Sequence, residues 1–235
     1  MDKIDSKDPN SVYIAFLKGM NKCMKISTGK EALELLTRSQ RVYEDLEKNI
    51  EFGEKLYESK IILRQWVDEV MDYPQFEFRS FVHDKKLNAL SQYFSDVRFD
   101  DLVEQRTEML EKINLFFGNV VLKHIPHESF VIDFFVSPTK GVMIIELNPF
   151  HIGAGACLFS WKTDREVMMN GPQEFRIQEK QADDTMYKSF LTVQWEKYLV
   201  LHHNVPSPNY SKDQLEHHKK HTDNLTNKEG NCIVA

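Results

Sequence analysis

The sequence has few cysteines, no long apolar run and no excess of basic residues. Its three cysteines, Cys23, Cys157 and Cys232, are odd in number and far apart, which argues against a disulfide framework and a cysteine metal knuckle. No apolar stretch approaches the roughly 20 residues that span a bilayer, and the first residues do not resemble a signal peptide. The net charge of −6 argues against nucleic acid as the main partner, because phosphate binding relies on clustered basic residues. Together these absences favour a cytoplasmic, reducing compartment.

The chain does contain enough apolar material for a substantial core. Its 235 residues are 41% hydrophobic and include 16 phenylalanines. This composition argues against wholesale disorder and predicts one large domain, with or without a small appendage.

Helical periodicity occurs in three regions of the sequence. Residues 28–49 carry apolar side chains at helical spacing, with a possible break near Ser39. The same periodicity follows Asp100 and Asp101, either of which could cap a helix. A last helix is expected from about residue 184 to residue 203.

Strand patterns predict a sheet made of hairpins. Residues 60–70 form an apolar, β-branched run that predicts a strand. Alternating apolar and polar residues predict a hairpin over residues 77–94 and a second one over residues 130–150. Because hairpins form antiparallel sheets, the predicted fold class is α+β rather than doubly wound α/β.

The second predicted hairpin places oxygen-bearing side chains in apolar strands. Glu146 and Asn148 are two residues apart and therefore point the same way, and the expected turn puts Asp133 opposite roughly residue 146. Two acids opposite each other destabilise a strand pair unless a cation lies between them. Magnesium suits such oxygen ligands, and it completes its coordination with water and phosphate. The alternative is that all three side chains face solvent and are simply hydrated.

Several stretches, taken in order, resemble the cell division cycle protein 123 family. These are IILRQW, EFRSFV followed by LNALSQY, FVIDFF followed by MIIELNPF, and LFSW. The resemblance extends from about Ser6 to Trp161. It implies an ATP-grasp-like antiparallel sheet with flanking helices that binds ATP and magnesium. It also implies a role as an assembly factor for eukaryotic translation initiation factor 2, with that factor's γ subunit as the expected partner.

The resemblance further implies roles for individual residues. Asp133, Glu146 and Asn148 match the family's metal ligands, with Glu146 where an aspartate is usual. The strand around Arg64 would be the hinge that meets adenine, and Arg79 matches a motif arginine that binds phosphate or acidic groups. A structural salt bridge is the alternative for both arginines. The residues with an implied role in nucleotide binding are Ile62, Leu63, Arg64, Gln65, Arg79, Asp133, Glu146 and Asn148.

The resemblance implies an upstream lobe whose lysine grips the nucleotide phosphates, and this sequence is expected to lack it, either as a reduced member of the family or as an incomplete gene model. We therefore expect residues 1–59 to be a partly helical remnant of that lobe, residues 60–203 to form the C-terminal ATP-grasp lobe, and residues 204–235 to be a flexible tail. Three hypotheses follow: a nucleotide-binding assembly factor, an ATP-dependent carboxylate–amine ligase, and a nucleotide-free prenylated scaffold. The missing lysine weighs against the ligase, because a transferred phosphate needs positioning and charge neutralisation.

Two further features are local. Gly153 to Gly155 could let a ligand approach the backbone closely beside the proposed metal site, and Cys157 is expected to be a small buried side chain rather than a nucleophile. The sequence ends in Cys232-Ile-Val-Ala235, a CaaX pattern that predicts farnesylation of Cys232. A single lipid without a basic patch would give at most weak membrane attachment.

Overall fold

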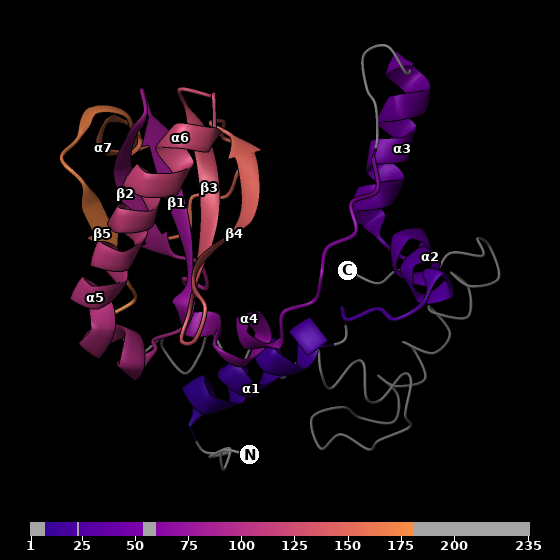
Figure 1. Cartoon of the computed structure of the whole chain (residues 1–235). Coiled ribbons are helices and arrows are strands. Elements are labelled where there is room, and N and C mark those ends of the chain that lie inside the picture. Colours follow the sequence, from indigo (N-terminus) through magenta and orange to yellow (C-terminus); the bar gives the residue numbers. More distant parts are fainter. Residues whose placement is uncertain (1–7, 23, 54–59, 181–235) are drawn as a thin grey trace, which may run out of the picture. The chain divides into compact units, whose positions relative to one another are not determined.

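The computed structural model describes residues 8–22, 24–53 and 60–180. These residues belong to two compact units: one contains the chain up to Met20 and from Val67 onward, and the other contains Asn21 to Trp66 (Figure 1). Most of helix α1 (Pro9–Lys22) therefore belongs with the sheet, where Leu17 joins the main hydrophobic core. The expected domain boundary at residue 60 does not coincide with this division.

The first unit is built around one five-stranded sheet with the strand order β4-β3-β1-β2-β5. The pairs β1–β2, β1–β3 and β3–β4 are antiparallel, whereas the short strand β5 pairs in parallel with β2. The predicted α+β class is confirmed, and the parallel edge strand is an addition to the expected antiparallel sheet. The strands are β1 (Glu77–His83), β2 (Lys86–Gln92), β3 (Phe130–Ser137), β4 (Gly141–Pro149) and β5 (Glu174–Arg176).

Both predicted hairpins are present. The β1–β2 turn places Asp84 and Lys85 at φ angles of 49° and 59°, and Gly141 begins β4 at φ 82°. In the second hairpin Asp133 pairs with Glu146, as the expected turn required, and the register shifts by one residue immediately afterwards. This bulge increases the local twist of β4 without moving Glu146 from the face that it shares with Asp133.

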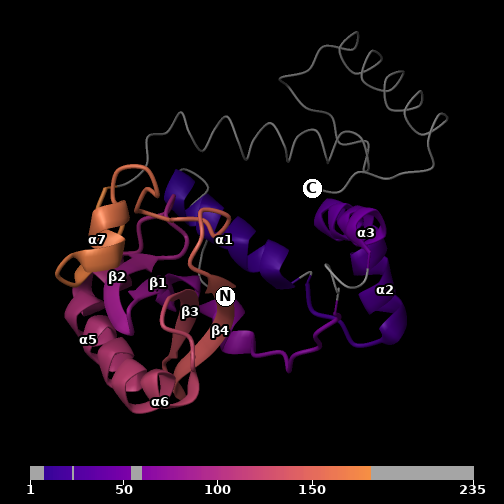
Figure 2. The same ribbon diagram turned by 90° about the horizontal axis from the view of Figure 1, so that it is seen from above.

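The two faces of the sheet carry separate apolar clusters. On one face Phe78, Ile132 and Phe134 pack with α5 residues such as Ile113. On the other face Phe81 belongs to a smaller cluster with the chain after β4 and with helix α7. Figure 2 shows α5 and α6 on one side of the strands and α7 on the other.

The helices and turns of this unit are short, apart from α1 and α5. Neither Asp100 nor Asp101 caps α5, because Phe99 occupies the cap position. The two acids lie in the first turn, where their negative charges interact favourably with the helix dipole. The expected aspartate cap is therefore wrong. The elements are α4 (Asp68–Asp72), the 3-10 turn η1 (Pro74–Phe76), α5 (Asp100–Phe116), the π-helical turn η2 (Phe117–Val121), α6 (Leu122–His124) and α7 (Arg165–Asn170).

The second unit contains helices α2 (Gly29–Thr37) and α3 (Gln40–Phe52). Thr28 and Glu31 form a capping box at the start of α2, and Ser39 accepts a hydrogen bond from the backbone N–H of Val42 at the start of α3. The expected break near Ser39 is confirmed, because α2 ends at Thr37 and Ser39 caps α3.

The predicted strand over residues 60–70 is wrong. Residues 60–67 form no strand or helix, Ile62 is 79% exposed, and α4 begins at Asp68. An apolar β-branched run becomes a strand only where a neighbouring strand accepts its backbone hydrogen bonds, and no described strand pairs with this run. The predicted helix over residues 184–203, the tail and Cys232 lie outside the described residues.

Candidate functional site

The candidate site centres on an ion pair buried within the sheet. Arg79 of β1 and Asp133 of β3 lie opposite each other in the strand register. The Nε and Nη2 atoms of Arg79 donate hydrogen bonds to Oδ1 and Oδ2 of Asp133 at 2.8 and 2.7 Å. Only 7% of Arg79 and 1% of Asp133 are exposed. This two-pronged geometry is among the strongest arrangements of a guanidinium with a carboxylate.

The remaining contacts of Arg79 come from other elements. Its Nη1 donates to the carbonyl oxygen of Gly155 at 3.1 Å, and the guanidinium lies 5.0 Å from the ring centroid of Tyr93. A Cβ atom at Gly155 would lie 3.3 Å from Nη1, so a larger residue here would press on the arginine. The glycine-rich loop thus lies close to Arg79, and the close approach of a ligand to this loop stays a prediction.

Glu77 belongs to this site and is absent from the sequence predictions. It precedes Arg79 by two residues on β1, so that both side chains lie on the same face. Glu77 is 8% exposed, and burial raises its pKa to about 8, reinforced by the charges of Asp133 and Glu146 and opposed by Arg79. The alternation in Glu77-Phe78-Arg79 was the signal that could have identified it.

Three acids, Glu77, Asp133 and Glu146, lie around the Arg79 guanidinium, and these groups change one another's pKa values. Burial raises the pKa of Asp133, and Glu146 adds to this, while the hydrogen bonds from Arg79 act in the opposite direction. The same bonds raise the pKa of Arg79 itself. Cys157 lies nearby with its pKa raised by burial to about 12, so it is a protonated thiol at neutral pH and not an activated nucleophile.

The structure brings the three predicted metal ligands onto one face of the sheet. Asp133 pairs with Glu146, and Asn148 pairs with Val131 two residues along β3. Their environments differ, because Glu146 is exposed and Asn148 is partly buried, whereas both carboxylate oxygens of Asp133 are bonded to Arg79. Across residues 8–22, 24–53 and 60–180, no group of three or more His, Cys, Asp and Glu side chains is placed to hold a metal ion.

The residues of the predicted adenine hinge lie in a different compact unit from Arg79 and Asp133. Ile62, Leu63, Arg64 and Gln65 belong to the other compact unit and are exposed. Their contact with a nucleotide stays a prediction, as does lipidation of Cys232 outside the described residues. Within the described part of the chain, no helix is both long and apolar enough to span a membrane.

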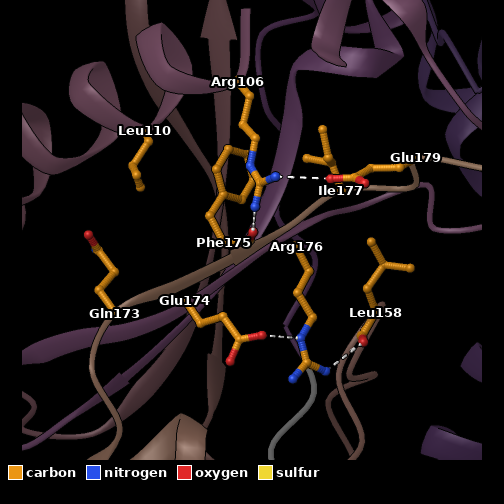
Figure 3. Close-up of a pocket in the computed structure, with 9 residues that line it drawn as sticks. All are labelled: Arg106, Leu110, Leu158, Gln173, Glu174, Phe175, Arg176, Ile177 and Glu179. Carbon is orange, nitrogen blue, oxygen red and sulfur yellow. Dashed lines mark hydrogen bonds and ion pairs between the residues drawn. The ribbon is translucent and has the colours of Figure 1, made fainter.

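A cavity between α5 and β5 is lined by two arginines whose charges are already paired (Figure 3). Arg106 donates to Glu179 at 3.0 Å and to the carbonyl oxygen of Phe175. Arg176 donates to Glu174 at 2.7 Å and also pairs with Asp164. These bonds hold β5 against its neighbours, which indicates a structural role for the two arginines.

Comparison with known proteins identifies relatives that share this sheet. The D123 family model matches residues 12–219. The translation initiation factor eIF2 assembly protein of Xenopus laevis is 28% identical over 141 residues, and cell division cycle protein 123 of Candida glabrata is 30% identical over 151 residues. The solved structure of Cdc123 from Schizosaccharomyces pombe matches with a TM-score of 0.53 and 26% identity, over 66% of this chain and 63% of that chain.

The chain spans less than half the length of these curated relatives. The matched segments are 60% of this chain but 41% of the Xenopus protein and 41% of the Candida protein. The structural match confirms the predicted resemblance and is consistent with an ATP-grasp-like fold.

Proposed function

Because this chain belongs to the D123 family, we propose that it acts as an assembly factor for translation initiation factor eIF2. The observation that carries the proposal is the family match over residues 12–219, which includes the whole described sheet and the Arg79–Asp133 site. Relatives from a frog and from yeasts carry the name eIF2 assembly protein or cell division cycle protein 123. Within eIF2, we propose the γ subunit as the direct partner.

Binding to purified eIF2 tests this proposal. The full chain, carrying an affinity tag, is mixed with each eIF2 subunit separately and with the assembled factor, and the retained protein is measured. We expect retention of the γ subunit and of subunit mixtures that contain it. Retention of no subunit at micromolar concentration would overturn the proposal, and retention of another subunit alone would overturn the choice of γ.

We further propose magnesium-ATP as the ligand of the face that carries Glu146. The donor set fits a hard cation, because the exposed Glu146 carboxylate and the Asn148 amide oxygen lie on one face of the sheet. Asp133 fits less directly, since it is 1% exposed and its oxygens are bonded to Arg79. Glu146 and Asn148 would hold the ion, with Asp133 orienting Arg79 behind them. The bound ion would neutralise the phosphate charge.

A thermal melting experiment separates nucleotide binding from partner binding. Ligand that binds the folded state alone raises the melting temperature. We expect magnesium-ATP to raise the melting temperature of the wild-type chain and to have little effect on Glu146→Gln, while Glu104→Gln, on the exposed side of α5, behaves like the wild type. Absence of any shift at millimolar magnesium-ATP would overturn the nucleotide proposal and leave eIF2 binding to be judged by its own assay.

A further inference from the structure

We infer that a second cavity, where β1 and β4 end and β3 begins, binds an oxyanion attached to an apolar body. This β4-end cavity has a volume of about 600 Å³, a size typical of sites for small molecules or for single side chains of a partner. Its apolar lining residues are Phe130, Leu147, Pro149, Phe150 and Met169, and its polar lining residues are His83, His127, Ser129, Asn148 and Arg165.

Strand register brings these residues together. Val82 pairs with Phe130, and Phe130 pairs with Pro149, so His83 at the end of β1 lies near the start of β3 and the end of β4. Helix α7 supplies Arg165 and Met169 from the same side of the sheet as the smaller apolar cluster. The cavity shares Asn148 with the proposed magnesium site and none of the acids of that site.

The charge of the lining favours an anion. None of the ten described lining residues is acidic, and Arg165 is positively charged. The side chain of Arg165 is exposed and forms no hydrogen bond or ion pair with any residue that the structure describes. The arginines of the cavity beside β5, by contrast, are both paired with acids. An unpaired guanidinium in the wall of a cavity is suited to a carboxylate or a phosphate.

His83 supplies an independent indication of a ligand. Its Nδ1 atom is buried and has no hydrogen-bond partner in the described part of the chain. The nearest acidic atom, Oδ2 of Asp84, lies 3.6 Å away, which is too long for a hydrogen bond. Buried polar atoms are rarely left unsatisfied, so a ligand oxygen that reaches this ring would remove an energetic cost.

The apolar part of the wall is held in place by ring contacts. The ring of Phe150 lies 5.4 Å from that of His83 and 5.1 Å from that of Trp161, between centroids. The Trp161 indole N–H donates to the carbonyl oxygen of Ala154, which fixes the indole in turn. A preorganised aromatic wall next to an unpaired cation selects a ligand with an apolar body close to its charged group.

Binding of simple organic anions to the full chain tests this inference. The probes are phenyl phosphate and phenylacetate, with inorganic phosphate and benzyl alcohol as matched compounds that lack the apolar body or the charge. EDTA in every sample removes magnesium and with it the proposed nucleotide site. We expect phenyl phosphate, phenylacetate or both to bind at least about tenfold more tightly than either matched compound, equivalent to about 1.4 kcal/mol. The tighter of the two identifies phosphate or carboxylate as the source of the charge.

Three variants localise the binding. Arg165→Gln should weaken it at least about tenfold, and Leu147→Glu, which adds a negative charge at a 48% exposed wall position, should abolish it. Lys162→Gln removes the same charge from the turn just before α7 without lining the cavity and should leave affinity unchanged. The inference is overturned if neither probe binds at millimolar concentration, if neither exceeds its matched compounds, or if the Arg165 and Lys162 variants behave alike. Glu146→Gln should bind like the wild type, which separates this site from the magnesium site.

Discussion

Arg79 and Asp133 lie directly opposite each other on neighbouring strands and form two hydrogen bonds of 2.7 and 2.8 Å inside the sheet. The pair lies between two strands that are 54 residues apart in sequence at this point. Asp133, which the sequence predicts as a metal ligand, is therefore already paired with the positively charged Arg79 in the folded protein. Breaking such a pair leaves a buried charge without compensation, which is more costly than removing both partners.

Replacement of Arg79 by methionine should destabilise the protein by about 3–5 kcal/mol, because Asp133 would remain buried without its counter-charge. The double variant Arg79→Met/Asp133→Leu should lose less than the sum of the two single variants. Urea denaturation followed by circular dichroism measures each free energy of unfolding. Lys112→Met, which breaks an exposed pair with Glu108 on α5, should cost less than about 1 kcal/mol. Equal losses for the Arg79 and Lys112 variants would contradict a structural role for the buried pair.

Glu77 should make the protein less stable as the pH rises. Its pKa is about 8 in the folded protein, against 4.5 for an ordinary glutamate, so the folded state holds a proton that the unfolded state releases between these values. This contribution is fully present below about pH 4.5 and is lost as the pH rises through about 8, with a slope of at most about 1.4 kcal/mol per pH unit. Glu77→Gln should flatten the decline measured by urea denaturation from pH 5 to 8.5. Glu104→Gln should retain the decline in stability with pH. An unchanged slope in the Glu77 variant would refute the assignment of this decline to Glu77.

Phe134 should be one of the most sensitive positions of the core. It is completely buried and packs edge-on against Phe116, with the ring centroids 6.0 Å apart. Phe134→Ala should cost about 3–5 kcal/mol, because it removes a large apolar surface and leaves a cavity. Leu122→Ala, at a residue that is 38% exposed, should cost much less. Thermal or urea unfolding of both variants is a sufficient check, and similar costs would disagree with the described core.

Substitutions in the β1–β2 turn should increase the stability of the protein. Asp84 and Lys85 both adopt positive φ angles, which strain ordinary side chains and suit an Asn-Gly turn. The double variant Asp84→Asn/Lys85→Gly should gain about 0.5–1 kcal/mol of stability. It retains the backbone hydrogen bond from residue 85 to the carbonyl oxygen of Glu128. Lys86→Gly, one residue later in β2, should instead destabilise the protein, and a loss of stability in the turn variant would argue against the positive φ angles.

The sequence predicted the parts of the site that depend on neighbouring residues. Strand alternation and the position of the turn were enough to place Asp133 opposite Glu146 and to put Asn148 on the same face. The same local reasoning failed for residues 60–70, because a strand requires a partner and the periodicity of one segment carries no information about its partner. It also missed β5, whose three residues are too short to show a pattern.

By itself, the sequence determined the two hairpins, the α+β class, the break at Ser39 and the register that sets two acids face to face, since each follows from side-chain period, turn residues and caps within a short segment. The tertiary structure alone decided that β1 lies beside β3, and hence that Arg79 bonds to Asp133 and that Glu77 is buried next to both. It also decided that the ends of β1 and β4 meet α7 around Arg165, whose side chain has no partner among the described residues. The order of strands is set by the burial of whole apolar faces, a property of the assembled chain that no single segment contains.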